Sequence, residues 1–224
     1  MTPGQLYIIG TPIGNLEDLS YRAHRLLTEV DFIICEDTRV TKKLLERYHI
    51  NKPLVSYHQH SKLARVDSII ARLKEGASAA LVSDAGTPGI SDPGNQVVAQ
   101  AVGNSLTVVP IPGPSALTSL LSVAGMPTDR FIFLGFLPHK KGREKIFNQI
   151  SQSEELTGFF ESPHRIIKTL GQLIKCCPNS QLVLGRELTK KFEQIVRGTP
   201  EAVLAELTKS PETLKGEFVV LIKK

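Results

Sequence analysis

The sequence predicts an α/β fold with two domains, because short apolar runs alternate with helical segments along its 224 residues. The apolar runs are typical of buried strands, and the segments between them repeat apolar residues at spacings of three and four. A proline-rich stretch divides the chain near its middle. We therefore expect a mostly parallel sheet in the N-terminal half and a mixed sheet in the C-terminal half.

Five strands are predicted in the first half of the chain. The runs that predict them are Leu6–Ile9, Phe32–Cys35, Leu54–Tyr57, Ala79–Val82 and Thr107–Val109. The connections between them are helical, with apolar residues recurring from Ala23 to Val30 and from Leu63 to Leu73. Helices of this kind cover both faces of a parallel sheet, and such sheets bind ligands at the carboxyl ends of their strands.

The segment from Pro110 to Ala116 has three prolines in seven residues, which is typical of a link between domains. We therefore expect domains at residues 1–112 and 113–224, with a new helix starting at Ser115. Five further strands are predicted beyond this segment, at Phe131–Leu134, Leu156–Phe160, Leu182–Leu184, Gln194–Arg197 and Phe218–Ile222. Apolar spacing predicts a helix around residues 166–174, and the end of the chain has more hairpin character.

Composition limits the classes of function. The net charge of +5 permits a polyanionic partner such as nucleic acid. No apolar run approaches the roughly 18 to 20 residues that span a bilayer, and the N-terminus lacks the features of a signal peptide, so we expect no membrane association and a cytoplasmic protein. The three cysteines, Cys35, Cys176 and Cys177, are too few for a disulfide framework or a zinc site, and we expect them to be reduced.

Each polar or glycine-rich cluster in the first half follows a predicted strand. Residues 10–15 follow the first strand, residues 35–39 the second, residues 57–60 the third, and the loop at residues 83–95 the fourth. Because the carboxyl ends of parallel strands meet at one edge of a sheet, these clusters should converge on a common crevice.

The loop LVSDAGTPGISDPGN, residues 81–95, does not have the spacing of a phosphate-binding loop. No lysine lies near its glycines, and Asp84 and Asp92 would repel a phosphate. The loop suits a ligand with hydroxyls, amines or positive charge. Adenosine carrying a sulfonium and an amino-acid tail fits that description.

Eight motifs in order resemble the tetrapyrrole methylase superfamily: LYIIGTPIGNLEDLSYRA, CEDTRVTKKLL, LVSDAGTPGISDPG, VVPIPGPSA, DRFIFLGFLPHKKGR, FFESPHRI, GRELTKKFE and KGEFVVLI. They extend from Leu6 to Ile222. The resemblance implies a class III S-adenosylmethionine-dependent methyltransferase, usually a homodimer, with the cofactor between two α/β domains. Within the superfamily the motifs are most similar to enzymes that methylate the ribose 2′-hydroxyl of a cytidine in the decoding region of small-subunit (16S) ribosomal RNA.

The resemblance also implies a set of residues that face the cofactor. By their positions in the motifs these are Ile13, Asp84, Ala85, Gly86, Ile90, Ser115, Ala116, Phe160, Glu161, Arg186, Glu187, Gly216 and Glu217.

A ribose hydroxyl is a weak nucleophile near neutral pH, so a general base is expected. The candidates are Glu36 and Asp37, with Arg39 or Arg165 holding the RNA backbone and His164 nearby. We hypothesise that Glu36 is the base and that Arg39 orients the acceptor. The predicted contacts to the RNA substrate, free or within an assembled small subunit, are His58, His60, Lys140, Lys141, Arg143, Arg165, Lys190 and Lys191.

Simpler interpretations exist for several of these residues. Asp37 and Asp92 are placed to cap the helices that follow them. His58 and His60 lack a convincing third ligand, so no metal site is expected. The basic runs are also typical of solvated surface. Phe159 and Phe160 lie in an apolar strand pattern that favours a core position over base stacking.

Two features depart from the family pattern. Gln59 and Ser61 stand where the family commonly has an acidic residue and an asparagine, and the chain ends at Lys224 without a basic helical extension. RNA binding is therefore expected to depend on the two main domains.

Two alternatives remain: a methyltransferase for a corrin or porphyrin precursor, and a non-catalytic binder of S-adenosylmethionine. The basic charge and the CEDTR and FFESPHR motifs favour the RNA enzyme.

Overall fold

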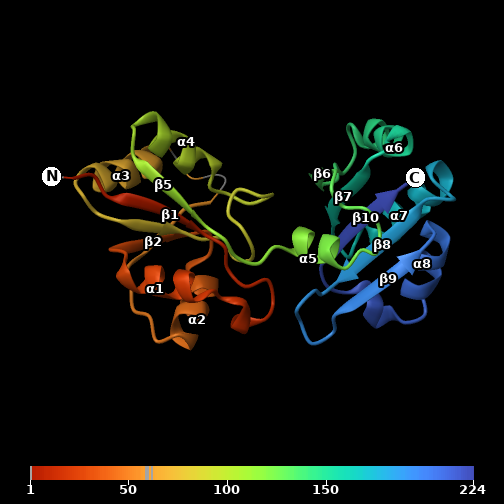
Figure 1. Cartoon of the computed structure of the whole chain (residues 1–224), viewed down its shortest axis with the longest axis horizontal. Helices are drawn as coiled ribbons and strands as arrows, with labels where there is room; N and C mark the ends of the chain where they lie inside the picture. Colours follow the sequence, from red (N-terminus) through yellow and green to blue (C-terminus); the bar gives the residue numbers. More distant parts are fainter. Residues whose placement is uncertain (1, 59–60, 62) are drawn as a thin grey trace. The chain divides into compact units, whose positions relative to one another are not determined.

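The computed structural model describes residues 2–58, 61 and 63–224, and the chain forms two compact units that divide after Ser115 (Figure 1). The division falls in the proline-rich segment, close to the expected boundary between Pro112 and Gly113. In the described part of the chain, no helix is long and apolar enough to cross a membrane.

The first unit contains a five-stranded sheet in the order β3-β2-β4-β1-β5, and every neighbouring pair is parallel. Its strands are β1 (Gln5–Ile9), β2 (Phe32–Cys35), β3 (Leu54–Ser56), β4 (Ala79–Leu81) and β5 (Thr107–Ile111). Its helices are α1 (Tyr21–Glu29), α2 (Thr38–Arg47), α3 (Leu63–Lys74) and α4 (Asn95–Gly103), with a 3₁₀ turn at Leu16–Asp18. The predicted parallel sheet is confirmed.

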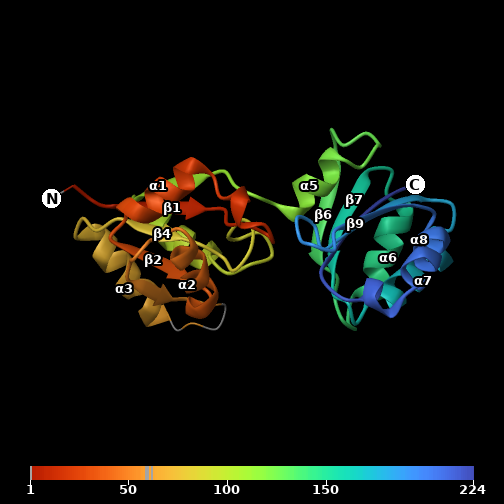
Figure 2. The same cartoon turned by 90° about the horizontal axis from the view of Figure 1, so that it is seen from below.

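Helices cover both faces of this sheet, with α3 and α4 on one side and α1 and α2 on the other (Figure 1, Figure 2). The strand residues alternate between the two cores. Phe32 and Ile34 pack with α3 and α4, whereas Ile33 packs with α1 on the opposite face. The fully apolar strands predicted from the sequence are therefore buried on both faces.

Two local expectations in the first unit were wrong in detail. The predicted last strand stopped at Val109, but β5 continues through Pro110 to Ile111. Proline is tolerated there because β5 is an edge strand and its outer side needs no donor. Asp92 does not occupy the N-cap position of α4, which belongs to Gly94 at φ 138°.

The second unit contains a mixed sheet, as predicted, and its strand order is β6-β7-β10-β8-β9. Its strands are β6 (Phe131–Phe136), β7 (Leu156–Glu161), β8 (Gln181–Arg186), β9 (Gln194–Gly198) and β10 (Phe218–Lys223). Its helices are α5 (Ala116–Ser122), α6 (Arg143–Gln152), α7 (Ile166–Cys176) and α8 (Pro200–Leu207), with a 3₁₀ turn at Pro211–Leu214. Only β6 and β7 pair in parallel within the described sheet, and the other pairs are antiparallel.

One face of this sheet packs against α6, α7 and α8 (Figure 2). Phe159, Leu170 and Phe218 are fully or almost fully buried in that core. The core position predicted for Phe159 is confirmed. Phe160 points to the other face, where its ring is half-buried and lies 5.0 Å from the ring of Phe133.

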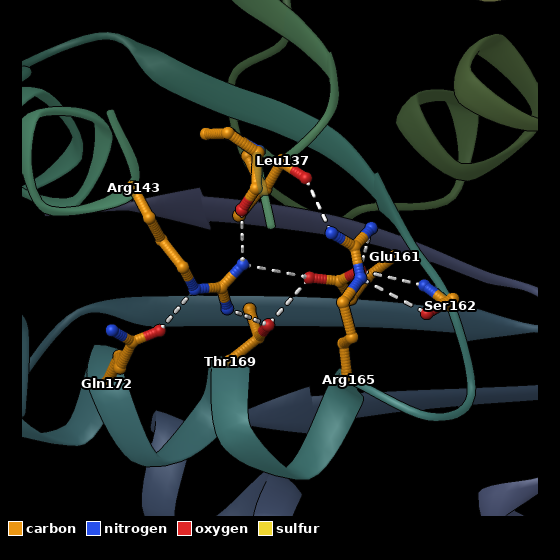
Figure 3. A network of polar contacts seen from close by, with 8 residues as sticks. Leu137, Arg143, Glu161, Ser162, Arg165, Thr169 and Gln172 are labelled. Carbon is orange, nitrogen blue, oxygen red and sulfur yellow. Dashed lines mark hydrogen bonds and ion pairs between the residues drawn. The ribbon is translucent and has the colours of Figure 1, made fainter. Parts of the chain in front are cut away.

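A buried ionic network fixes the end of β7 (Figure 3). The side chain of Glu161 is completely buried. Its Oε1 lies 2.6 Å from Arg165 Nη2 and accepts from the backbone N–H of Ser162 at 2.9 Å. Its Oε2 accepts from the hydroxyl of Thr169 at 2.7 Å and lies 3.7 Å from Arg143 Nη1.

The two arginines connect this carboxylate to the loop that follows β6. Arg143 donates to the carbonyl of Pro138 at 3.1 Å and to the Thr169 hydroxyl at 2.6 Å, and its Nε donates to Gln172 at 2.7 Å. Arg165 donates to the carbonyl of Leu137 at 2.7 Å. Because nearly every polar atom has a partner, the buried charges are compensated, and the loop is held against α7.

Removal of the Glu161 carboxylate should destabilise the second unit strongly. Glu161→Ala leaves two buried guanidinium groups without their counter-ion, which should lower the free energy of unfolding by about 3–5 kcal/mol in urea titrations. Glu29→Ala is the matched control, because Glu29 forms an ion pair with Arg25 that is half exposed. The control should cost no more than about 1 kcal/mol. Equal losses in the two variants would contradict this account of the network.

Candidate functional site

Three loops of the first unit meet at the carboxyl edge of its sheet. β1 lies between β4 and β5, so the segments that follow these strands are neighbours. Thr11 and Gly86 exchange two backbone hydrogen bonds, at 2.9 and 3.0 Å. The hydroxyl of Thr11 donates to the carbonyl of Ser83 at 3.1 Å. The loops after β1 and β4 are therefore joined directly.

Glycine permits an equally close contact between the loops after β1 and β5. A Cβ on Gly113 would lie 2.6 Å from the carbonyl oxygen of Gly10, and a Cβ on Gly10 would lie 2.9 Å from the Cα of Gly113. Gly86 adopts φ 79°, a conformation that side chains rarely adopt. The site thus has a surface built from backbone, and Gly10, Gly113 and Thr11 shape it although they were not among the predicted site residues.

The structure gathers the predicted cofactor-facing residues of this unit on these loops. Ile13 is buried, Asp84 is half-buried, and Ala85 and Ile90 are exposed. Ile90 exposes 47% of its surface, so this apolar side chain is accessible at the site. Residues 10–15, 83–94 and 111–115 contain no lysine or arginine. The loops therefore present apolar groups, backbone and the carboxylates of Asp84 and Asp92, and they are poorly suited to a phosphate.

Asp84 also connects the ends of β4 and β2. Its Oδ1 accepts from the backbone N–H of Asp37 at 3.1 Å. Glu36, the residue before, is half-buried. Burial raises the pKa of Glu36, and the nearby charges of Asp84 and Asp37 raise it further, whereas His58 opposes the shift. Glu36 therefore binds a proton more readily than an ordinary glutamate.

Asp37 has the opposite electrostatic environment. Its Oδ1 caps α2 by accepting from the backbone N–H of Arg39 at 2.8 Å, which confirms the predicted capping role. Its Oδ2 lies 2.6 Å from Nη2 of the exposed Arg39 side chain. Hydrogen bonds from the Arg39 side chain and backbone lower the pKa of Asp37 to about 2. Asp37 is consequently a weak base, and its main effect is to orient Arg39.

The third polar cluster is described only in part, because Gln59 and His60 lie outside the described residues. The backbone N–H of His58 donates to the Ser61 hydroxyl at 2.9 Å, and the Ser61 N–H donates to the His58 carbonyl at 2.8 Å. Among residues 2–58, 61 and 63–224, no group of three or more metal-ligating side chains gathers in one place.

The predicted cofactor-facing residues of the second unit also converge on one sheet edge. Phe218, the first residue of β10, pairs with Glu161 at the end of β7 and with Arg186 at the end of β8. The three predicted pairs are therefore neighbours: Phe160 and Glu161, Arg186 and Glu187, and Gly216 and Glu217. Ala116 is the first residue of α5.

Glu187, Glu217 and Lys190 form a second ionic group at this edge. Lys190 Nζ lies 2.9 Å from carboxylate oxygens of both glutamates, and Glu187 Oε1 accepts from the Glu217 N–H at 3.0 Å. Burial alone would raise the pKa of Glu187, but Lys190 and the Glu217 N–H lower it overall. A Cβ on Gly216 would lie 2.4 Å from Glu187 Cγ, so the glycine permits this contact.

Several predicted contact residues use their side chains within the protein. Arg186 is buried and donates to the carbonyls of Lys215, Phe192 and Glu212 at 2.7, 3.1 and 2.6 Å. Arg143 departs from the expectation of a solvent-facing basic run, because its guanidinium is buried beside Glu161. Its role in the structure is to hold the loop after β6.

The predicted substrate residues Lys140, Lys141 and Lys191 remain at the surface. Arg165 and Lys190 instead form ion pairs with glutamates of the second unit. Lys140 and Lys141 are exposed on the loop before α6, and Lys191 is exposed between β8 and β9. His164 is exposed in the turn after β7, and the Arg165 side chain is 14% exposed. Phe192, beside Lys191, was not predicted and exposes 64% of its surface. An aromatic residue next to two lysines in LTKKFE is the sequence signal for it.

Comparison with known proteins agrees with this geometry. Residues 5–204 match the family model of the tetrapyrrole (corrin/porphyrin) methylases. A relative from Halalkalibacterium halodurans is 44% identical over 221 residues, which cover 98% of this chain and 76% of the relative. A relative from Thermotoga maritima is 41% identical over 219 residues and covers 98% of both chains. Both are named ribosomal RNA small subunit methyltransferase I.

Solved structures share the fold at low sequence identity. A diphthine synthase aligns with a TM-score of 0.74 at 16% identity, over 99% of this chain and 90% of that one. Uroporphyrin-III C-methyltransferase from Thermus thermophilus, solved with S-adenosylhomocysteine, aligns with a TM-score of 0.64 at 17% identity, over 97% of both chains. From the family match over residues 5–204 and the relatives that are 41% and 44% identical over 98% of its length, this chain belongs to the tetrapyrrole methylase family.

Proposed function

We propose that this chain uses S-adenosylmethionine to methylate the ribose 2′-hydroxyl of a cytidine in the decoding region of small-subunit (16S) ribosomal RNA. The observation that carries this proposal is the similarity to the relative from Thermotoga maritima, which extends over 98% of both chains. The similarity therefore includes both units and the segments that carry the proposed site residues. The free ribosomal RNA and the assembled small subunit are the two candidate forms of the substrate, and the cytoplasm is the proposed compartment.

The loops of the first unit fit this cofactor. Bound S-adenosylmethionine supplies a methyl group on a positively charged sulfur. The carboxylate of Asp84 can accept hydrogen bonds from a hydroxyl or an ammonium group and can attract a cation. Gly10 and Gly113 have no side chains, so the backbones of their two loops lie close together. Ile13 and Ile90 supply apolar surface, and these loops contain no basic residue that would compete for the carboxylate. The predicted residues of the second unit, Ser115 of the linking segment and Ala116 complete the proposed set.

Glu36 is the proposed general base. Its raised pKa favours acceptance of the proton that leaves the 2′-hydroxyl as the oxygen attacks. Asp37 keeps its negative charge and holds the exposed guanidinium of Arg39, which can then position a phosphate of the acceptor strand. His58 lies close enough to Glu36 to favour its charged form. His164 is proposed to help hold the acceptor.

The exposed lysines Lys140, Lys141 and Lys191 are proposed phosphate contacts, which should make RNA binding dependent on salt.

A homodimer is also proposed. Phe131 and Phe136, on the edge strand β6, expose 41% and 55% of their surfaces, which favours association through this region. Sedimentation equilibrium tests it, since a monomer at micromolar concentration would contradict the dimer.

Transfer of labelled methyl groups tests the proposed function. The chain is incubated with labelled S-adenosylmethionine and, separately, naked small-subunit RNA, small subunits that lack the modification, and uroporphyrinogen. Label should appear in RNA and, after digestion, in a 2′-O-methylated cytidine. Label in the porphyrinogen alone would favour the tetrapyrrole alternative, and cofactor binding without any transfer would favour a binding module.

Gly113→Ala should weaken cofactor binding by separating the loops after β1 and β5. The added methyl group would lie 2.6 Å from the Gly10 carbonyl, so the backbone must move. Titration calorimetry with S-adenosylhomocysteine should show a weaker dissociation constant by about tenfold, equal to ~1.4 kcal/mol. Gly103→Ala is the matched control, because a Cβ there meets nothing within 4 Å. Unchanged affinity in Gly113→Ala would remove these loops from the cofactor site.

Glu36→Gln should slow methyl transfer without destabilising the fold. Because folding raises the pKa of Glu36, the charged carboxylate is less favourable in the folded state than in the unfolded state. This charge therefore destabilises the fold at pH values above the folded-state pKa. The destabilisation disappears at pH values below the unfolded-state pKa, where the carboxyl is protonated in both states. Thermal unfolding should therefore show a variant at least as stable as the natural chain near pH 8, with the gain lost at about pH 3.5. Single-turnover transfer should fall by roughly 100- to 10,000-fold.

Glu46→Gln, which replaces an exposed carboxylate on α2, is the matched control and should change neither transfer nor its pH dependence. Full transfer by Glu36→Gln would show that another group accepts the proton.

A further inference from the structure

The loop between β8 and β9 carries an exposed aromatic side chain beside a cation. Phe192 exposes 64% of its surface, and the ammonium of the exposed Lys191 lies 5.5 Å from the centre of its ring. Single exposed apolar residues are common on proteins. This one differs because the loop around it is fixed by several independent contacts.

Arg186 supplies the first of these contacts. Its buried guanidinium donates to the carbonyl of Phe192 at 3.1 Å and also binds the carbonyls of Lys215 and Glu212. The backbone of Phe192 is therefore attached to the body of the second unit. An aromatic ring on a fixed backbone loses little conformational entropy when a flat partner covers it.

Lys190 and Glu193 supply the others. Lys190 bridges Glu187 and Glu217, so its charge is neutralised within the protein. The carboxylate of Glu193 accepts from the backbone N–H of Thr189 at 2.6 Å, which turns it back onto the loop. Glu187 and Thr189 hold φ angles of 50° and 67°, a strained conformation that these contacts maintain. Of the two adjacent lysines, Lys191 is the one available to an outside anion.

The loop also lies at the sheet edge where the predicted cofactor-facing residues of the second unit converge. It begins directly after Arg186, at the end of β8, which pairs with the start of β10; the start of β10 pairs on its other side with the end of β7. These are the segments proposed to face the cofactor, so the loop lies on the edge of the second unit that the methyl donor is proposed to contact. A ring for stacking and a cation for phosphate are the two groups with which proteins hold unpaired RNA.

We propose that Phe192 stacks on an unpaired base of the RNA substrate and that Lys191 contacts a phosphate next to that base. This inference rests on the proposed function and extends it, because it assigns a substrate contact to a residue outside the proposed catalytic and cofactor sets. It also separates the two lysines, with Lys191 binding RNA and Lys190 supporting the loop.

Steady-state kinetics on assembled small subunits that lack the modification test the proposal. Phe192→Ala should raise KM by roughly 10- to 100-fold with little change in kcat, as expected for the loss of one base stack. Phe192→Trp and Phe192→Tyr should retain the natural KM, whereas Phe192→Leu should resemble Phe192→Ala.

Lys191→Ala should reduce the salt dependence of binding by about one phosphate contact. Tyr21→Ala, which removes a side chain that is 97% exposed on α1, is the matched control.

A photoreactive benzoyl-phenylalanine at position 192 gives a readout independent of turnover. It should crosslink to RNA of the small subunit, and the same group at position 21 should not. Crosslinking to a ribosomal protein alone, a natural KM in Phe192→Ala, or full rescue by leucine would each overturn the inference while leaving the proposed function intact. If the natural chain methylates neither RNA nor subunits, the proposed function fails and this inference fails with it.

Discussion

The parallel pairing of β1 with β4 on one side and β5 on the other is the constraint on which the first unit depends. It brings three loops together at one edge, at the point where the strand order places β1 between two later strands. The contact is then completed by backbone, through the Thr11–Gly86 pair and the approach of Gly10 to Gly113. Side chains other than hydrogen would hold these loops apart, so the shape of the site follows from the glycines at the strand ends.

The carboxylates at this edge differ in their electrostatic environments and therefore in their roles. Asp84 supports the backbone of Asp37, and Asp37 in turn caps α2 and holds Arg39. Glu36 is the carboxylate that burial and like charges make more basic. The fold retains it although a neutral residue would be less costly there, which is typical of groups kept for chemistry. In the second unit the buried carboxylate of Glu161 has the opposite character, since its two arginines serve to fix a loop.

The sequence predicted all ten strands, because buried strands leave a strong apolar signal. It also predicted that the polar clusters would share one edge, since that follows from parallel pairing. Details that depend on distant partners were not predictable. The burial of Arg143 requires Glu161, which follows it by a full helix and strand, and the local sequence HKKGR is typical of solvated surface. The extension of β5 through Pro110 requires knowledge that β5 is an edge strand.

The proposed reaction is tested most directly on RNA from cells. Small-subunit ribosomal RNA is isolated from cells with and without this gene, and the nucleotides of the decoding region are analysed by mass spectrometry. One cytidine should lose its 2′-O-methyl group when the gene is absent and regain it when the gene is restored. An identical set of modified nucleotides in both samples would contradict the proposed reaction.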